Sequence, residues 1–145
     1  MQVRHILSDK GRSIIAVAGH ATLAEAARQL AQKKIGALIV QDAEGTLSGI
    51  ISERDLVRAI ADRGPAALAD PVAHHMTHAV ATCAECDSVD AIMEAMTRGR
   101  FRHMPVLDES ERLCGLISIG DVVKTRIAET LSEAEALRGY ISATA

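Results

Sequence analysis

The sequence predicts an α/β (α+β) fold made of two copies of a strand–helix–strand–strand–helix unit, each a small sheet flanked by helices. A shift of 66 residues aligns 14–60 with 80–126 without a gap, and a repeat of this length sets the architecture. Phe101 and Tyr140 are the only aromatic residues, so the core must be aliphatic, as is common where sheets pack on helices. Because no Ser/Gly-rich spacer separates the copies, we expect them to pack as one body with pseudo-two-fold symmetry.

The first helix of each copy is predicted at 22–34 and at 88–100, where apolar side chains recur at i, i+3, i+4 and i+7. The apolar positions are Leu23, Ala26, Ala27 and Leu30 in the first copy and Val89, Ile92, Met93 and Met96 in the second. Thr22 and Glu25 have the spacing of a capping box, and Ser88 can cap the second helix.

Three short strands and a closing helix complete each copy. The strands are predicted at 13–18, 36–42 and 47–52, and again at 79–83, 102–108 and 113–118. The polar turns "AEGT" and "ESER" join the last two strands of each copy into a hairpin. The first closing helix should stop at "DRGP" (62–65), and the second, with a stripe through Val123, Ile127, Leu131 and Ala134, at Gly139.

These elements divide the chain along its length. The predicted parts are 1–64 (an N-terminal segment plus the first repeat), 65–78 (a linker in which Pro71 starts a short helix), 79–130 (the second repeat) and 131–145 (a C-terminal helix extension and tail).

Composition narrows the function classes. The net charge of −3 gives no global basic field for nucleic acid. No apolar run approaches the ~20 residues of a membrane span, and "MQVRHILSDKG" lacks the apolar region of a signal peptide. Three cysteines are too few for a disulfide framework. We therefore expect a soluble cytoplasmic protein without membrane or nucleic-acid partners.

The repeated motif Gly-apolar-apolar-Ser-x-x-Asp closes each hairpin, in "GIISERD" (49–55) and "GLISIGD" (115–121). As local structure, Ser52 with Asp55 and Ser118 with Asp121 are capping boxes. The same geometry also sets a hydroxyl and a carboxylate at a helix start beside a sheet edge. A carboxylate repels phosphate, but its two oxygens can accept both hydroxyl hydrogens of a vicinal diol such as ribose.

Basic residues that could receive a phosphate follow in "RGRFRHMPV" (98–106). Arg100 and Arg102 share one face of the predicted strand, and His103 follows. Arg54, at the start of the first closing helix, is a further candidate. A charged edge strand that deters sheet pairing would show the same pattern. The corresponding first-copy segment "KKIGALI" (33–39) is far less basic, which predicts that the two sites are unequal.

Residues 10–130 contain two correctly spaced copies of the unit and the segments "IGALIVQD", "SERD", "RFRHMPV" and "SIGD". In these features they resemble a tandem CBS (cystathionine β-synthase) domain pair, or Bateman module, of the small stand-alone bacterial type. The resemblance implies a non-catalytic regulatory module that binds AMP, ADP, ATP or NAD in a cleft between the repeats and signals energy or redox state by a conformational shift. It implies no catalytic cofactor.

The resemblance also implies residue roles. It assigns ribose binding to Asp55, Ser52, Asp121 and Ser118, and phosphate binding to Arg102, His103, Arg100 and Arg54. The implied adenine contacts are Ile14, Ile15, Ile35, Gly36, Ala37, Val80, Ala81, Phe101, Met104 and Pro105. Family members commonly dimerise through their helices, so a homodimer and a protein target are expected.

An alternative class uses Cys83 and Cys86, which with His74, His75 and His78 upstream could bind zinc or act as a redox dithiol. The repeat disfavours it, since Cys83 aligns with Val17 in a strand and Cys86 with His20 in a loop. We do not expect an enzyme: the sequence has no nucleophile elbow, Walker A loop or Rossmann glycine pattern.

Overall fold

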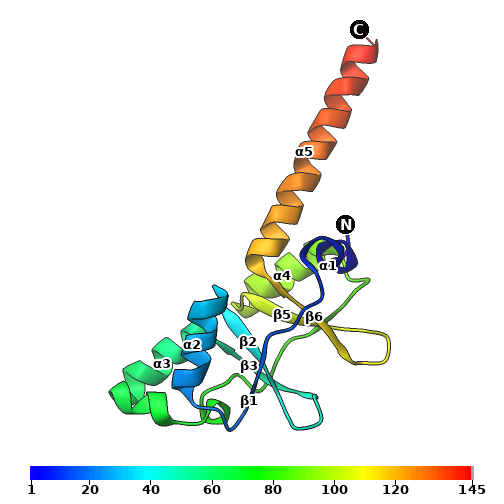
Figure 1. Cartoon of the computed structure of the whole chain (residues 1–145). Coiled ribbons are helices and arrows are strands. Elements are labelled where there is room, and N and C mark those ends of the chain that lie inside the picture. Colours follow the sequence, from blue (N-terminus) through cyan, green and yellow to red (C-terminus); the bar gives the residue numbers. More distant parts are fainter. Residues whose placement is uncertain (145) are drawn as a thin grey trace. The chain divides into compact units, whose positions relative to one another are not determined.

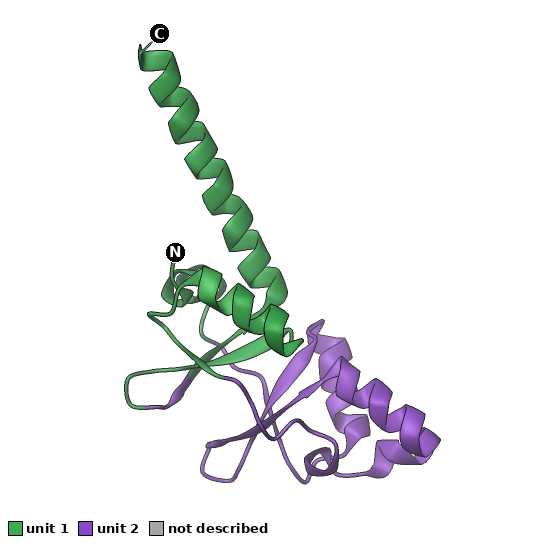
Figure 2. Ribbon diagram, turned by 180° about the vertical axis from the view of Figure 1, so that it is seen from behind, with its two compact units in different colours: residues 1–12, 82–110, 114–145 green, residues 13–81, 111–113 purple. Residues whose placement is uncertain are grey.

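A computed structural model describes residues 1–144 and divides the chain into two compact units. Unit 2 contains residues 13–81 and 111–113, and unit 1 contains residues 1–12, 82–110 and 114 onward (Figure 2). The predicted mixed α/β class, with two small three-stranded sheets flanked by helices, is confirmed.

Unit 2 holds the first repeat and the segment that follows it (Figure 1). Its elements are β1 (Ala16–Ala18), α2 (Leu23–Lys33), β2 (Ala37–Gln41), β3 (Leu47–Ser52), α3 (Glu53–Arg63) and the 3-10 helices η1 (Gly64–Ala69) and η2 (Val72–His74). In the sheet, β1 pairs with β2 in parallel and β2 with β3 antiparallel. The start of β1, the start of β2 and the end of β3 therefore share one end of the sheet.

Unit 1 repeats this arrangement with the second copy. Its elements are α1 (Val3–Lys10), β4 (Cys83–Ala84), α4 (Val89–Gly99), β5 (His103–Leu107), β6 (Leu113–Ser118) and α5 (Ile119–Thr144). The strand order is β4-β5-β6, with β4 and β5 parallel. No helix within residues 1–144 has the length and apolar character needed to cross a bilayer.

Each unit has its own aliphatic core, as the near-absence of aromatic residues predicted. The largest fully buried side chains of unit 2 are Leu23, Leu38, Ile39, Val40, Ile51 and Val72. Those of unit 1 are Val3, Leu7, Val89, Val106, Ile117 and Val122. Burial of an aliphatic side chain of this size contributes about 1.5–3 kcal/mol each before the entropy of ordering is subtracted.

Local signals placed the helix starts correctly. Thr22 accepts the N–H of Glu25, whose carboxylate accepts the N–H of Thr22, and Ser88 accepts the N–H of Ala91. Helix α3 ends at Arg63, as the Gly-Pro stop predicted. The predicted helix after Pro71 is the single 3-10 turn η2.

Other boundaries were wrong. The strand predicted at 13–18 has strand conformation only over Ala16–Ala18, and the one at 79–83 is displaced to Cys83–Ala84. Helix α5 continues through Gly139 to Thr144. One glycine costs a helix only about 1 kcal/mol relative to alanine, too little to end a helix whose other residues favour it.

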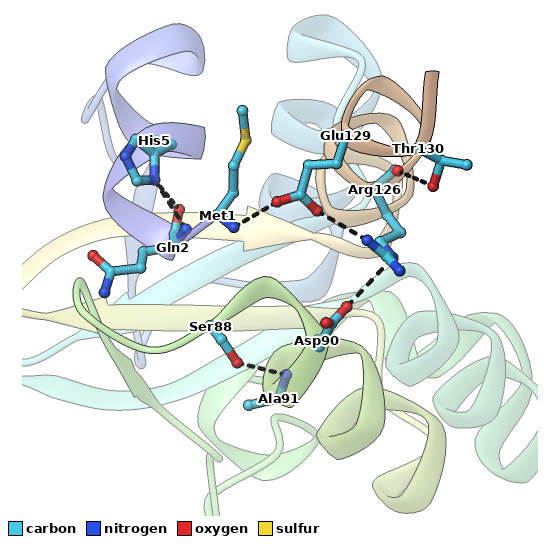
Figure 3. Close-up of polar contacts among 9 residues, drawn as sticks. All are labelled: Met1, Gln2, His5, Ser88, Asp90, Ala91, Arg126, Glu129 and Thr130. Carbon is cyan, nitrogen blue, oxygen red and sulfur yellow. Dashed lines mark hydrogen bonds and ion pairs between the residues drawn. The ribbon is translucent and has the colours of Figure 1, made fainter. Parts of the chain in front are cut away.

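Helix α1 was not predicted, and it packs within unit 1. The N–H groups of Val3 and Arg4 donate to the carbonyls of Asp87 and Glu85. Figure 3 shows the Met1 amine paired with Glu129 of α5, which Arg126 links to Asp90 at the start of α4. Helix α1 thus belongs to the compact unit that contains the second repeat.

Candidate functional site

The first strand-to-helix joint is formed by Ser52, the last residue of β3, and Asp55 in the first turn of α3. The Ser52 N–H donates to Asp55 Oδ2 at 2.9 Å, and the Asp55 N–H donates to Ser52 Oγ at 3.4 Å. The Ser52 hydroxyl also donates to Oδ2 at 3.1 Å. The predicted capping box is therefore confirmed.

Asp55 is 5% exposed, and both its oxygens have partners within unit 2. Its Oδ1 accepts the Thr77 hydroxyl at 3.4 Å and lies 3.6 Å from Arg58 Nη1. Thr77 lies outside the aligned repeat, within the predicted linker 65–78, and its backbone forms two hydrogen bonds with Ile50, of 2.9 and 3.1 Å. A ligand at this carboxylate would have to displace an internal contact.

The second joint repeats the cap with Ser118 and Asp121. The Ser118 N–H donates to Asp121 Oδ2 at 2.9 Å, and the Asp121 N–H donates to Ser118 Oγ at 3.2 Å. Here the outside partner is Lys10 of α1, whose ammonium donates to the same Oδ2 at 2.6 Å and to the Leu116 carbonyl at 2.8 Å. The Asp121 side chain is 24% exposed, so this carboxylate is more accessible than that of Asp55.

Opposing influences act on the pKa of Asp121. Desolvation by burial raises it, but hydrogen bonds from Lys10 and Ser118 and the Lys10 charge together hold the pKa below its ordinary 3.8. The carboxylate is therefore ionised at neutral pH, as acceptance of a diol requires.

The hairpin start is joined to the helix start in the same way in both repeats. The Gly36 carbonyl accepts the N–H of Glu53 at 3.0 Å, and the Arg102 carbonyl accepts the N–H of Ile119 at 2.8 Å. Ala37 is also the register partner of Ser52. Arg102 of the basic segment and the helix start that carries the second Ser–Asp pair are therefore neighbours within unit 1.

The predicted phosphate residues lie on α3 and on the connection between α4 and β5. Arg102 is exposed and directly precedes β5, whose first residue is the half-buried His103. Arg100 is exposed and ends α4 in the left-handed conformation (φ 57°), as Lys34 ends α2 (φ 55°). Arg54 is the exposed second residue of α3. The three second-repeat residues lie within four positions of one another on one connection.

The predicted adenine residues differ in accessibility. Ile14, Ile15, Ile35, Gly36, Val80 and Phe101 are half-buried, and Ala81 is exposed. Ala37, Met104 and Pro105 are buried, and Met104 belongs to the core of unit 1. The Ile15 carbonyl accepts the Ile39 N–H at 3.2 Å, which sets Ile15 alongside β2. Val80 and Ala81 belong to unit 2, whereas Phe101, Met104 and Pro105 belong to unit 1.

The residues of the zinc or dithiol alternative have separate environments. Cys83 is buried, and its thiol donates to the Pro105 carbonyl at 3.7 Å, whereas Cys86 is exposed. Desolvation, with the charges of Asp87 and Cys114, raises the pKa of Cys83 to about 12. His75 Nε2 lies 2.8 Å from Asp70 Oδ2. Within residues 1–144, no three His, Cys, Asp or Glu side chains are grouped to hold a metal ion.

Lys10 and Thr77 are the site residues that sequence reasoning missed. Each meets the Asp of one joint, and each lies outside the aligned segments 14–60 and 80–126. The sequences around them, "SDKGR" and "HMTHA", have nothing in common, so no repeat pattern could have indicated either residue.

A surface hollow of about 370 Å³ lies elsewhere on unit 1, between α1 and the loop after β4. Its lining includes His5, Ser8, Arg12, Glu85 and Cys86, and none of the predicted ribose, phosphate or adenine residues. The hollow therefore contains no residue of the predicted nucleotide site.

Comparisons with known proteins agree with this architecture. A CBS-domain protein from Agrobacterium tumefaciens is 48% identical, with a TM-score of 0.84 over 86% of this chain and 92% of that one. A CBS-domain protein from Pyrobaculum aerophilum complexed with AMP is 27% identical (TM-score 0.74; 83% and 89% covered). A CBS domain pair in complex with 5′-methylthioadenosine and S-adenosyl-L-methionine is 26% identical (TM-score 0.78; 89% and 98% covered).

The chain spans 66% and 60% of the length of the first two curated relatives that it matches. The CBS domain family model matches twice, at residues 3–62 and 72–128, which together include both Ser–Asp joints. The chain therefore belongs to the CBS domain family, as a tandem pair of CBS domains.

Proposed function

We propose that the chain is a regulatory module that binds an adenosine nucleotide, with Asp121 as the principal ribose ligand. The observation that carries the proposal is the second joint, where an ionised, partly accessible carboxylate lies beside a basic segment. Relatives complexed with AMP, 5′-methylthioadenosine and S-adenosyl-L-methionine support an adenosine-containing ligand.

The two joints are proposed to be unequal. Asp55 uses both oxygens internally, with Ser52 on Oδ2 and Thr77 on Oδ1, and it is almost completely buried. The hydrogen bonds from Ser118 and Lys10 both fall on Oδ2 of Asp121. A diol can approach the second carboxylate through Oδ1 at a lower cost than it can approach the first.

The basic segment favours a ligand that carries phosphate. Arg102 and Arg100 can form charge-assisted hydrogen bonds with phosphate oxygens, which are roughly twice as strong as neutral ones. The proposed ligands are therefore AMP, ADP, ATP or NAD. A nucleoside without phosphate, such as 5′-methylthioadenosine, would lack these contacts.

Lys10 offers a route from ligand to signal. A diol on Asp121 competes with the Lys10 ammonium for the carboxylate, so occupancy weakens a contact that holds the end of α1. A ligand that binds one conformation better than another shifts the population toward it. We propose that the regulatory output, read by a protein target, begins with this change at α1.

Isothermal titration calorimetry of the full chain with AMP, ATP, NAD and 5′-methylthioadenosine tests the proposal. Micromolar binding corresponds to about 8 kcal/mol, and we expect AMP to bind more tightly than 5′-methylthioadenosine. Asp121→Asn should weaken AMP binding about tenfold or more, and Asp55→Asn is the matched control at the other joint.

The outcomes separate the parts of the proposal. Arg102→Ala should lower AMP affinity toward that of 5′-methylthioadenosine, while leaving 5′-methylthioadenosine affinity unchanged. If Asp55→Asn abolishes binding and Asp121→Asn does not, the site belongs to the first joint. If none of the four ligands binds to the wild-type chain, the proposed function is wrong.

A further inference from the structure

Helix α5 carries an exposed apolar seam with a seven-residue period. The seam is formed by Val123, Ile127, Thr130, Ala134, Leu137 and Ile141, which are spaced alternately four and three residues apart. Val123, Ile127, Leu137 and Ile141 are between 40% and 60% exposed. Figure 2 shows the later part of α5 running away from the rest of unit 1, and Val122 is the one α5 residue in the buried core.

This spacing is the signature of a coiled coil. Residues at alternating intervals of four and three occupy the a and d positions of a heptad, which form one continuous stripe on a helix. With Ile127, Ala134 and Ile141 at a, positions d are Val123, Thr130 and Leu137. The seam covers about three heptads, the length at which such a pattern indicates pairing rather than chance.

We propose that this seam packs against α5 of a second copy of the chain, in a parallel and in-register coiled coil. The charges beside the seam select this partner and this direction. Glu133 occupies a g position and Arg138 the e position five residues later. In a parallel homodimer the g residue of one helix meets the following e residue of the other, so Glu133 pairs with Arg138 twice by symmetry.

The antiparallel arrangement places like charges together. If Ile127 packs against Leu137 of the other copy, Glu133 faces Glu133, and Lys124, at e, lies near Arg138. Like charges at these flanks destabilise pairing. The other flanking cation, Arg126 at g, is already tied to Asp90 and Glu129 of its own chain (Figure 3).

The composition of the seam limits its strength. Thr130 and Ala134 at its centre bury little apolar area, so the pairing should be reversible and concentration-dependent. Burial of Thr130 leaves no unsatisfied hydroxyl, because this group donates to the Arg126 carbonyl at 3.0 Å. The proposed pairing involves α5 alone and does not require a bound nucleotide.

The test is sedimentation equilibrium of the full chain without nucleotide. Wild type should dimerise reversibly. Leu137→Asp, which puts a charge into the seam, should raise the dimer dissociation constant about a hundredfold or more. Ala136→Asp adds the same charge to the exposed position next to it, outside the seam, and should change the constant less than about threefold. Circular dichroism checks that both variants keep their helix content.

Charge reversal then tests direction. In the parallel dimer, Glu133→Arg and Arg138→Glu should each weaken association about fivefold, and the double variant should recover it. Tighter association of Arg138→Glu, through Lys124 of the other copy, would overturn the parallel arrangement. A wild-type chain that stays monomeric, or equal effects of Leu137→Asp and Ala136→Asp, would overturn the second copy as the occupant of the seam.

Discussion

Gly49 and Gly115 occupy equivalent positions in the two copies of the repeated motif, yet alanine should be much less tolerated at position 49 than at position 115. A Cβ at Gly49 would lie 2.7 Å from the Thr77 carbonyl oxygen, which is backbone. A Cβ at Gly115 would lie 2.7 Å from Leu7 Cδ2, the end of a side chain that can rotate. The Thr77 carbonyl cannot move without disturbing its hydrogen bond from Ile50.

The expected magnitudes follow from these contacts. At Gly49, overpacking costs about 1–3 kcal/mol and a weakened backbone hydrogen bond about 1 kcal/mol. The lower unfolded-state entropy of alanine offsets about 0.4–1 kcal/mol. We therefore expect Gly49→Ala to lower the free energy of unfolding by about 2–3 kcal/mol, and Gly115→Ala, where Leu7 repacks, by at most about 1 kcal/mol.

Thermal unfolding followed by circular dichroism measures the difference. At about 2–4 °C per kcal/mol for a chain of this size, Gly49→Ala should melt several degrees below Gly115→Ala. Urea titration of both variants provides a second measure of stability. If Gly115→Ala is as destabilising as Gly49→Ala, the reasoning from these two close approaches is refuted.

Three further predictions concern unit 1. Leu7→Ala should lower the free energy of unfolding, measured by urea denaturation, by about 2–5 kcal/mol because Leu7 is 1% exposed. A loss no larger than that from substituting an exposed α5 leucine would show that α1 does not belong to this core. The lowered pKa of Asp121 means that its ionised form contributes stability above about pH 4 that is lost as pH falls through the folded-state pKa. The stability difference between wild type and Lys10→Met should therefore shrink in thermal melts taken from pH 6 down to about pH 2, and a constant difference would contradict the ion pair. In peptide mapping after alkylation at pH 8, Cys86 should be labelled first and Cys83 last. The thiolate is the nucleophile, and the pKa of the buried Cys83 is about 12. Early labelling of Cys83 would contradict its burial.

The parts of the fold that could be predicted are those set by neighbours in sequence. Both Ser–Asp caps involve residues three positions apart, and so does the box of Thr22 and Glu25. The repeat extends to backbone details that propensity alone would not suggest. Gly45 and Glu111, 66 residues apart, both have positive φ in the hairpin turns (81° and 59°).

The parts that could not be predicted depend on distant contacts. Lys10 meets Asp121 across 111 positions, and α1 has little apolar content beyond the side chains that it buries in unit 1. Packing of this kind leaves no periodic trace in a single sequence, because it is specified by the surface that receives the helix. The end of α5 could not be predicted for the opposite reason. Gly139 suggests a helix end, but its cost of about 1 kcal/mol is too small to end the helix, which continues to Thr144.

The two joints show where a difference between duplicated sites can originate. Their caps are alike, and so are the hydrogen bonds that join hairpin start to helix start. What differs is the side chain that arrives from outside the aligned repeat, a hydroxyl from Thr77 in one case and an ammonium from Lys10 in the other. A hydroxyl adds no charge, whereas the ammonium favours the ionised carboxylate and occupies one of its oxygens. If the proposed nucleotide site is correct, the affinity of each joint is therefore set largely by the segment that covers it, because the caps themselves cannot distinguish one joint from the other.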